Sequence, residues 1–238
     1  ASADGQTESG TVNMGAETGY VLNTTDNIRF NSHQFAHDDS SLNAGDTVTT
    51  YTNDEVSDET VGATVTDLGP FVRFEVDEDV IVTDDDYVGM YVYMVTGKKR
   101  GNYYLISDSD ENTPDTITVV VDDVEEINEN DVYNIIDRVY TREGYNNGAY
   151  SAIINFAGSG TANSPITWDT SGTVILDGKD LDSSLETNVL FSQWGNMDYL
   201  TIDGFIIMNA YNGISISGGG SAEYDSILNN TIHSISNR

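Results

Sequence analysis

The sequence predicts an all-β protein, and three observations support this prediction. Val, Ile, Thr and Tyr, which favour strands, are abundant. Short runs of them alternate with Gly, Asn, Asp and Ser, and no long segment has helical periodicity. The run Val-Ile-Leu-Asp-Gly at residues 174–178 returns as Leu-Thr-Ile-Asp-Gly at 200–204 and, weakened, at 226–230, a step of 26 residues each time. A fixed period of this length indicates a solenoid, in which coils stack on a shared core.

Composition limits the classes of partner. The 238 residues include 40 acidic and only 9 basic side chains, a formal net charge of −31. Such a charge disfavours nucleic acid and anionic membranes as direct partners. It is typical of solubility in a salty medium; the alternative is divalent-cation binding, because hard cations take carboxylate oxygens. The chain has no cysteine, which excludes disulfides, and no apolar run approaches the roughly 20 residues of a transmembrane helix.

The N-terminal half divides into three predicted segments. Residues 1–45 are polar and rich in Gly, Ser, Thr and Asn, which predicts an extended N-terminal arm. Residues 46–121 are predicted to form a small domain, a β-barrel or sandwich. Its six expected strands are residues 47–52, 63–68, 71–76, 87–95, 103–107 and 116–121. Residues 122–147 are acidic and irregular, which predicts a linker.

Residues 148–238 are predicted to form the coils of the solenoid. With a period of 26 residues, Leu176, Ile202 and Leu228 are expected to stack as one inward file, a core ladder. The coil pattern is still running near Arg238, and an open stack leaves strand edges unpaired. We therefore expect that the natural chain continues further or that another chain covers this end.

At these coils the chain resembles right-handed parallel β-helix proteins of the pectin-lyase-like type. The resemblance rests mainly on residues 199–216 and 228–232, with entry coils upstream at 158–167 and 174–178. It implies that the small β domain at residues 46–121 is followed by the first coils of a right-handed parallel β-helix. That family includes polysaccharide lyases, hydrolases, and the spikes and fibres of bacteriophages. A weaker resemblance over residues 79–121 is to small β modules that precede β-helices in phage-encoded and secreted proteins, and it implies an adaptor.

Two kinds of catalytic site were considered within the coils. Lyases of this family use calcium-binding carboxylates and a basic residue that removes a proton next to a uronate carboxylate. Lys179, beside Asp177, Asp180 and Asp182, is the nearest arrangement, and a solvated loop is the favoured alternative. Hydrolases need paired carboxylates. Asp177 and Asp203 would lie one strand spacing apart, about 5 Å, although each precedes a Gly in what is typically a turn.

Metal sites were considered outside the coils. Asp108, Asp110 and Glu111 resemble half of a calcium loop without its glycine and distal glutamate. They are the candidate site for a structural Ca²⁺, with an exposed acidic hairpin loop as the alternative, and no other cofactor is predicted. His33 and His37 have the spacing of a metal pair on a helix, but neither a helical pattern nor a third ligand supports them.

The order of arm, β adaptor and first coils favours a structural or attachment protein, the N-terminal portion of a virion tail fibre or spike. We expect a homotrimer at a virion or extracellular surface, in contact with other virion or surface proteins, with cell-surface polysaccharide as a candidate receptor. No catalytic residue is assigned. Two alternatives stay open: a secreted polysaccharide lyase or hydrolase of the β-helix fold, and a surface-layer or adhesion module of a halophilic microbe.

Overall fold

The computed structural model describes residues 8–9, 21–30, 33, 42–76, 85–111, 115–121, 127–156, 159–193, 198–217 and 223–235. The protein is all-β, as the composition predicts. It divides into two compact units: unit 1 comprises Ala1–Thr52 and Val139–Arg238, and unit 2 comprises Asn53–Arg138. Unit 2 is therefore an insertion within the chain of unit 1.

These boundaries differ from the predicted ones at both ends of the adaptor. The strand expected at residues 47–52 is β4 (Thr47–Tyr51), and it pairs in parallel with β14 (Ile166–Ser171) of unit 1. The segment expected to be a linker contains β11 (Val132–Ile136), which belongs to the sheet of unit 2. The local pattern of β4 shows that it is a strand, but its partner is far away in sequence and only tertiary pairing selects it.

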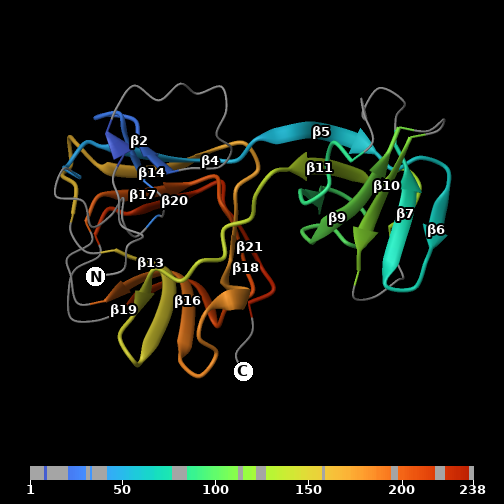
Figure 1. Cartoon of the computed structure of the whole chain (residues 1–238). Helices are drawn as coiled ribbons and strands as arrows, with labels where there is room; N and C mark the ends of the chain where they lie inside the picture. Colours follow the sequence, from blue (N-terminus) through green and yellow to red (C-terminus); the bar gives the residue numbers. More distant parts are fainter. Residues whose placement is uncertain are drawn as a thin grey trace. The chain divides into compact units, whose positions relative to one another are not determined.

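Unit 2 is a single antiparallel sheet whose strands run in the order β5-β11-β8-β9-β10-β7-β6. Besides β11, these strands are β5 (Asp54–Thr60), β6 (Val65–Asp67), β7 (Phe71–Glu75), β8 (Tyr91–Met94), β9 (Tyr103–Asp110) and β10 (Thr116–Val120). The two outermost strands of this order, β5 and β6, follow one another in the chain. Between them, the Val61 N–H donates to the Asp131 carbonyl and the Gly62 N–H to the Glu75 carbonyl, each at 2.8 Å. The segment that joins β5 to β6 thus bonds to the β11 side of the sheet and to the β7 side, so the sheet curls round, and we call unit 2 the barrel (Figure 1).

The contribution of β7 to the barrel core follows from the alternation of its side chains. On β7, Val72 and Phe74 are buried while Arg73 between them is only half-buried, because successive side chains of a strand point to opposite faces. Ile117 and Val119 of the neighbouring β10 are completely buried in the same cluster. Burial along β7 therefore has a period of two, as expected of a strand with one apolar face.

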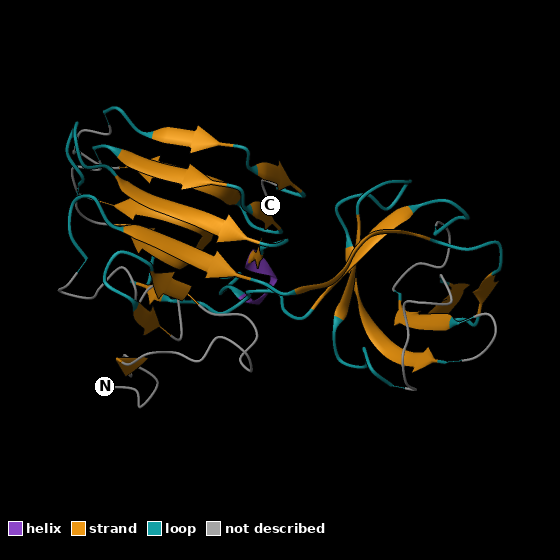
Figure 2. Ribbon diagram, turned by 90° about the horizontal axis from the view of Figure 1, so that it is seen from above, coloured by secondary structure: helices purple, strands orange, loops and turns teal. Residues whose placement is uncertain are grey.

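Unit 1 is built from three parallel ladders of strands (Figures 1 and 2). The first consists of β13 (Tyr150–Phe156), β16 (Glu186–Gln193) and β19 (Asn212–Ser217). The second consists of β14, β17 (Leu200–Asp203) and β20 (Ser226–Leu228). The third consists of β15 (Ile175–Asp177), β18 (Ile206–Met208) and β21 (Thr231–His233). The chain visits the three ladders in the same order three times; we call β13–β15, β16–β18 and β19–β21 the first, second and third pass.

The core ladder expected from the 26-residue period is wrong. Leu176 lies on the third ladder, opposite Ile207, whereas Ile202 lies on the second ladder. Leu228 is opposite Asp203, and its side chain is 46% exposed, while Leu176 and Ile202 are buried. The run at 174–178 lies on the third ladder, whereas the runs at 200–204 and 226–230 both begin on the second ladder, where paired residues are 25 and not 26 positions apart. The 26-residue spacing is therefore not the number of residues in a coil.

Between the last two passes the structure gives a step of 25 residues on the second and third ladders, and of 24 on the first ladder, where Asn188 pairs with Asn212. Ile202 pairs with Ile227 and Ile207 pairs with Ile232, each 25 positions later. Left-handed backbone conformations recur with the same step: Tyr199 and Tyr224, Gly204 and Asn229, Asn209 and Ser234. These residues mark three corners, where a strand of one ladder gives way to the next.

The first pass is covered by other segments of unit 1. β4 lies beside β14, β12 (Tyr145–Asn146) lies antiparallel beside β13, and Tyr140 bridges to Leu176 of the third ladder. β2 (Val21–Asn23) pairs antiparallel with β4 and so extends the sheet that contains the second ladder.

The segment expected to be an extended N-terminal arm contributes strands to this cover. β1 (Glu8–Ser9) and β3 (Ile28–Phe30) lie in the same sheet as β2. Val21, Leu22 and Phe30 are buried. For its described residues, the expectation of an arm with little core of its own is therefore wrong; the remainder lies outside the described residues. A few well-spaced apolar side chains were sufficient to anchor a largely polar segment.

Candidate functional site

The most irregular corner of unit 1 lies between the first and second passes. From Asp177 at the end of β15 to Asn188 in β16, the chain advances 11 positions. From Met208 to Asn212, the residues paired with these one pass later, it advances only 4. The first of these corners thus carries an insertion of seven residues. In repeat proteins, insertions of this kind map to loops on one face, which is often the binding face.

Hydrogen bonds between residues close in sequence define the conformation of the insertion. It opens with the 3₁₀ turn η1 (Gly178–Asp180), where the Asp177 carboxylate accepts a hydrogen bond from the Lys179 N–H at 2.9 Å. A Cβ atom on Gly178 would lie 2.8 Å from the Asn209 carbonyl oxygen, so the turn packs tightly against the next pass. Further along, the Asp182 carboxylate accepts from both the N–H and the hydroxyl of Ser184, at 3.0 and 2.6 Å. The Ser184 hydroxyl and N–H hold the pKa of Asp182 below its usual value.

The insertion is also tied to the preceding pass. The Asp182 N–H donates to Ser151 Oγ at 3.1 Å, and the hydroxyl of Ser151 donates to Glu143. Ser151 is fully buried in β13. The loop therefore has a fixed conformation, supported from the first pass on one side and from the second on the other.

A cleft of about 560 Å³ lies between this insertion and the following pass. The insertion contributes Lys179, Leu181 and Leu185 to its wall, and Glu186, Thr187 and Tyr211 are also part of it. Its size is within the range of clefts that hold small ligands, about 300–1,000 Å³. The wall contains both apolar and polar groups, which suits a ligand that carries both.

Two polar groups of the cleft are held in place by the protein itself. Thr187 Oγ1 accepts a hydrogen bond from the Tyr211 N–H at 2.9 Å. Glu186 Oε1 accepts one from Asn212 Nδ2 at 3.0 Å, and the same amide also donates to Asn188 Oδ1 at 2.9 Å. Glu186 is therefore positioned by an amide ladder that joins the second and third passes.

The cleft contains one of the residues considered for catalysis, Lys179, but not the acidic group around it. Asp177 is completely buried beneath the turn. The carboxylate pair that we considered for a hydrolase is wrong, because Asp177 lies opposite Met208 and Asp203 lies opposite Leu228, in different ladders. The spacing argument failed because it used the same incorrect period.

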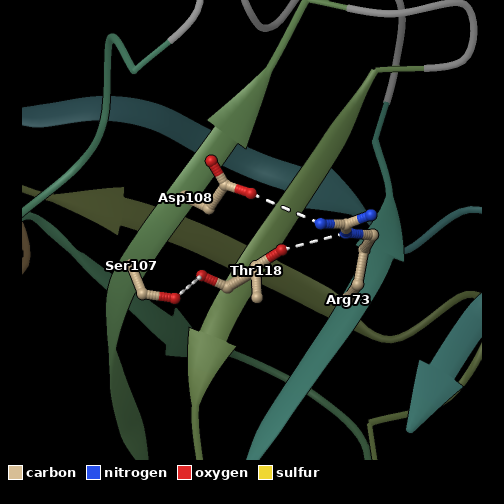
Figure 3. A network of polar contacts seen from close by, with 4 residues as sticks. All are labelled: Arg73, Ser107, Asp108 and Thr118. Atoms are coloured by element: carbon tan, nitrogen blue, oxygen red, sulfur yellow. Dashed lines mark hydrogen bonds and ion pairs between the residues drawn. The ribbon is translucent and has the colours of Figure 1, made fainter. Parts of the chain in front are cut away.

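Asp108, one of the candidate calcium residues, faces Arg73 across the strands of unit 2 (Figure 3). Arg73 of β7 donates to Asp108 of β9 at 3.4 Å and to Thr118 Oγ1 of β10 at 3.1 Å. The Ser107 hydroxyl donates to the Thr118 carbonyl at 3.1 Å. The network links three neighbouring strands, but its ion pair is about two-fifths exposed and so contributes little stability.

The structure does not gather these acidic residues into a metal site. Asp108 and Asp110 are strand residues of β9, which continues past the predicted end at residue 107, so the alternative of a hairpin loop is wrong for both. Within the described ranges, no group of three or more His, Cys, Asp or Glu side chains is placed to hold a metal ion. Calcium at Asp108, Asp110 and Glu111 stays a prediction.

His33 is a core residue of unit 1. Its side chain is 3% exposed, and Nε2 lies 3.0 Å from Thr50 Oγ1. The Tyr140 ring meets it edge-on at 5.0 Å between centroids, and the Trp168 ring stacks at 6.3 Å. Burial lowers the pKa of His33 to about 4. The other member of the pair considered for a metal, His37, lies outside the described residues.

Comparison with protein-family models, with curated proteins and with solved structures gives no match to this chain. Among the residues that the structure describes, no helix is long and apolar enough to cross a membrane.

Proposed function

We propose that the three passes of unit 1 are the first coils of a right-handed parallel β-helix, and that the protein is a structural or attachment protein of a virion tail fibre or spike. The observation that carries this proposal is the repeated visit to three parallel ladders in one order. Stacked coils of this kind contact only their neighbours, so they extend into a stiff shaft without a change of design. A shaft is what a fibre or spike requires.

The two ends of the described stack support the same proposal. The first pass is covered by β4, β12 and Tyr140, which provide a base. On the third pass, Ile227 and Ile232 are 49% and 46% exposed although they continue the buried files through Ile202 and Ile207. A shallow hollow lies over them. An apolar surface of this kind fits a neighbouring subunit better than it fits water.

Unit 2 suits the role of an adaptor. Where it leaves unit 1, the Asn53 N–H donates to Asp137 Oδ1 at 3.0 Å and the Asp137 N–H donates to the Asn53 carbonyl at 3.2 Å. The two ends of the barrel are thus side by side, an arrangement that lets a domain be inserted with little effect on its host. With its own closed core, the barrel can contact another protein of the particle independently of the coils.

The experiment that tests this proposal measures the oligomeric state and activity of the whole chain. Size-exclusion chromatography with light scattering is expected to give a trimer. Incubation with acidic polysaccharides is expected to release neither unsaturated products nor new reducing ends. A monomer that releases either product would contradict the proposal and support the lyase or hydrolase alternative.

The charge favours a second candidate, a surface-layer or adhesion module of a halophilic microbe. Forty acidic against nine basic side chains suit a surface that must stay hydrated in concentrated salt. A monomer without activity on polysaccharides, folded only at high salt, would favour this candidate over the virion protein.

A further inference from the structure

We infer that the cleft beside η1 is a binding site for a short, uncharged saccharide. The inference deepens the proposed attachment function, on which it rests, by naming the chemistry of the receptor. It starts from the seven-residue insertion at this corner, because the last two passes show that the fold itself needs only a short connection there. The extra residues supply Lys179, Leu181 and Leu185 to the cleft wall.

The chemistry of the wall matches a sugar ring. A saccharide has an apolar C–H face and a rim of hydroxyl groups that both donate and accept hydrogen bonds. Leu185 and the Tyr211 ring, both only half-buried, offer apolar contacts for such a face. Lys179 offers donors, and the Glu186 carboxylate offers acceptors to hydroxyl groups.

The polar groups are positioned before any ligand arrives. Glu186 is held by Asn212, and Thr187 is held by the Tyr211 backbone. The loop opposite is held by the bonds of Asp182 to Ser184 and Ser151. Pre-organisation reduces the entropy lost on binding, which matters most for small, flexible ligands such as oligosaccharides.

Charge and size select within the sugars and against proteins. The net charge of −31, with Asp180, Asp182 and Glu186 at this corner, repels uronic and sulfated sugars, and Lys179 is a single opposing charge. Uncharged hexose or N-acetylhexosamine oligomers carry no such penalty. A concave site of about 560 Å³ also suits a few sugar rings, whereas stable protein partners need a much larger and flatter contact.

The test uses the full chain on an array of oligosaccharides built from neutral hexoses, from N-acetylhexosamines and from uronic acids, followed by calorimetry with the best binder. Binding of an uncharged oligosaccharide is expected. Tyr211→Ala is expected to weaken it by about tenfold, because the aromatic contact is lost. Lys179→Ala, an exposed position with little effect on folding, is expected to weaken it as well. Tyr224→Ala removes an exposed tyrosine of a different corner and is the matched control, with unchanged affinity expected.

Three results would overturn the inference: no uncharged oligosaccharide binds, only uronic oligomers bind, or neither cleft variant changes the affinity. Circular dichroism of each variant shows that a lost affinity is not lost folding, and Lys179→Ala decides if Tyr211→Ala fails to fold. A trimer that is inactive on polysaccharides and binds no array sugar would refute the saccharide site alone, whereas a monomeric enzyme would refute the proposed function.

Discussion

At the scale of single residues, the burial of His33 makes the stability of unit 1 depend on pH. The imidazole is enclosed by Thr50, Tyr140 and Trp168, and its pKa is lowered from 6.5 to about 4 by desolvation. In the unfolded chain the same group takes up a proton near pH 6.5. Between these values the unfolded state binds more protons than the folded state, so stability falls as the pH falls from about 6.5 to about 4.

We predict that this one residue accounts for up to about 3 kcal/mol of stability lost across that window. Carboxylates also titrate there, so the measurement is a comparison: thermal unfolding of the wild type and of His33→Gln at several pH values. Glutamine retains a hydrogen-bonding group but does not titrate. The wild type is expected to lose more stability than the variant as the pH falls from 6.5; parallel pH profiles would refute the assignment.

Also at the residue scale, Gly204 is required by the corner between β17 and β18. Its φ of +86° lies in the left-handed region, and an added Cβ would stand 2.3 Å from Thr170 Oγ1 in the preceding pass. The corner can tolerate a non-glycine residue one pass later, where Asn229 has φ +52°. The distinguishing feature of Gly204 is therefore the close contact with Thr170 as well as the backbone conformation.

We predict that Gly204→Ala destabilises unit 1 by more than the roughly 1 kcal/mol of a left-handed alanine alone. Gly148→Ala is the matched control, because Gly148 has φ +81° with nothing within 4 Å of an added Cβ. Hydrogen exchange of peptides from unit 1 measures the loss of stability in both variants. Equal losses of protection in the two variants would mean that the contact with Thr170 is unimportant.

At the scale of elements, the sequence predicts a strand best where apolar and polar residues alternate. The expected strands at β6, β7, β8, β9 and β10 are present. β5 was missed because Asp54–Thr60 is almost entirely polar, and acidic residues are rare in strands. Pairing with β11 makes it a strand, and β11 was missed because its apolar residues stand within an acidic segment. Tertiary pairing overrides local preference in both cases.

The 26-residue alignment of the repeat conceals the insertion that forms the candidate cleft. Aligning residues 174–178 with 200–204 superimposes β15 on β17, two strands of different ladders, and leaves no gap. The insertion becomes visible only when β15 is aligned with β18. The signal that would have revealed it is the 25-residue recurrence of corner residues, such as Tyr199 and Tyr224.

At the scale of the whole molecule, charge opposes the compact state. A net charge of −31 on 238 residues creates self-repulsion that salt screens, with a Debye length of about 10 Å at 0.1 M and about 3 Å at 1 M. The same charge is expected to favour solubility and to repel polyanions. Association of three copies would bring these charges closer together and increase the dependence on salt.

We predict that the melting temperature of the full chain rises steadily as sodium chloride is increased from about 0.05 M to about 1 M. The melting temperature is measured from the circular dichroism signal of the β-strands. In a variant with several Asp→Asn changes at exposed positions of unit 2, the same increase in sodium chloride is expected to raise the melting temperature less. A melting temperature independent of salt in both proteins would show that self-repulsion is not important for stability.

The central claim of this account is the pairing of consecutive passes, in which Thr201 lies opposite Ser226 and not opposite Ile227. The chain has no cysteine, so a pair of introduced cysteines reports this register directly. Neighbouring strands are about 4.8 Å apart, within the reach of a disulfide. We predict that mild oxidation closes an intramolecular disulfide in Thr201→Cys/Ser226→Cys and not in Thr201→Cys/Ile227→Cys. Mass spectrometry of the single chain measures whether the disulfide has formed. A disulfide in the second variant and free thiols in the first would contradict the account.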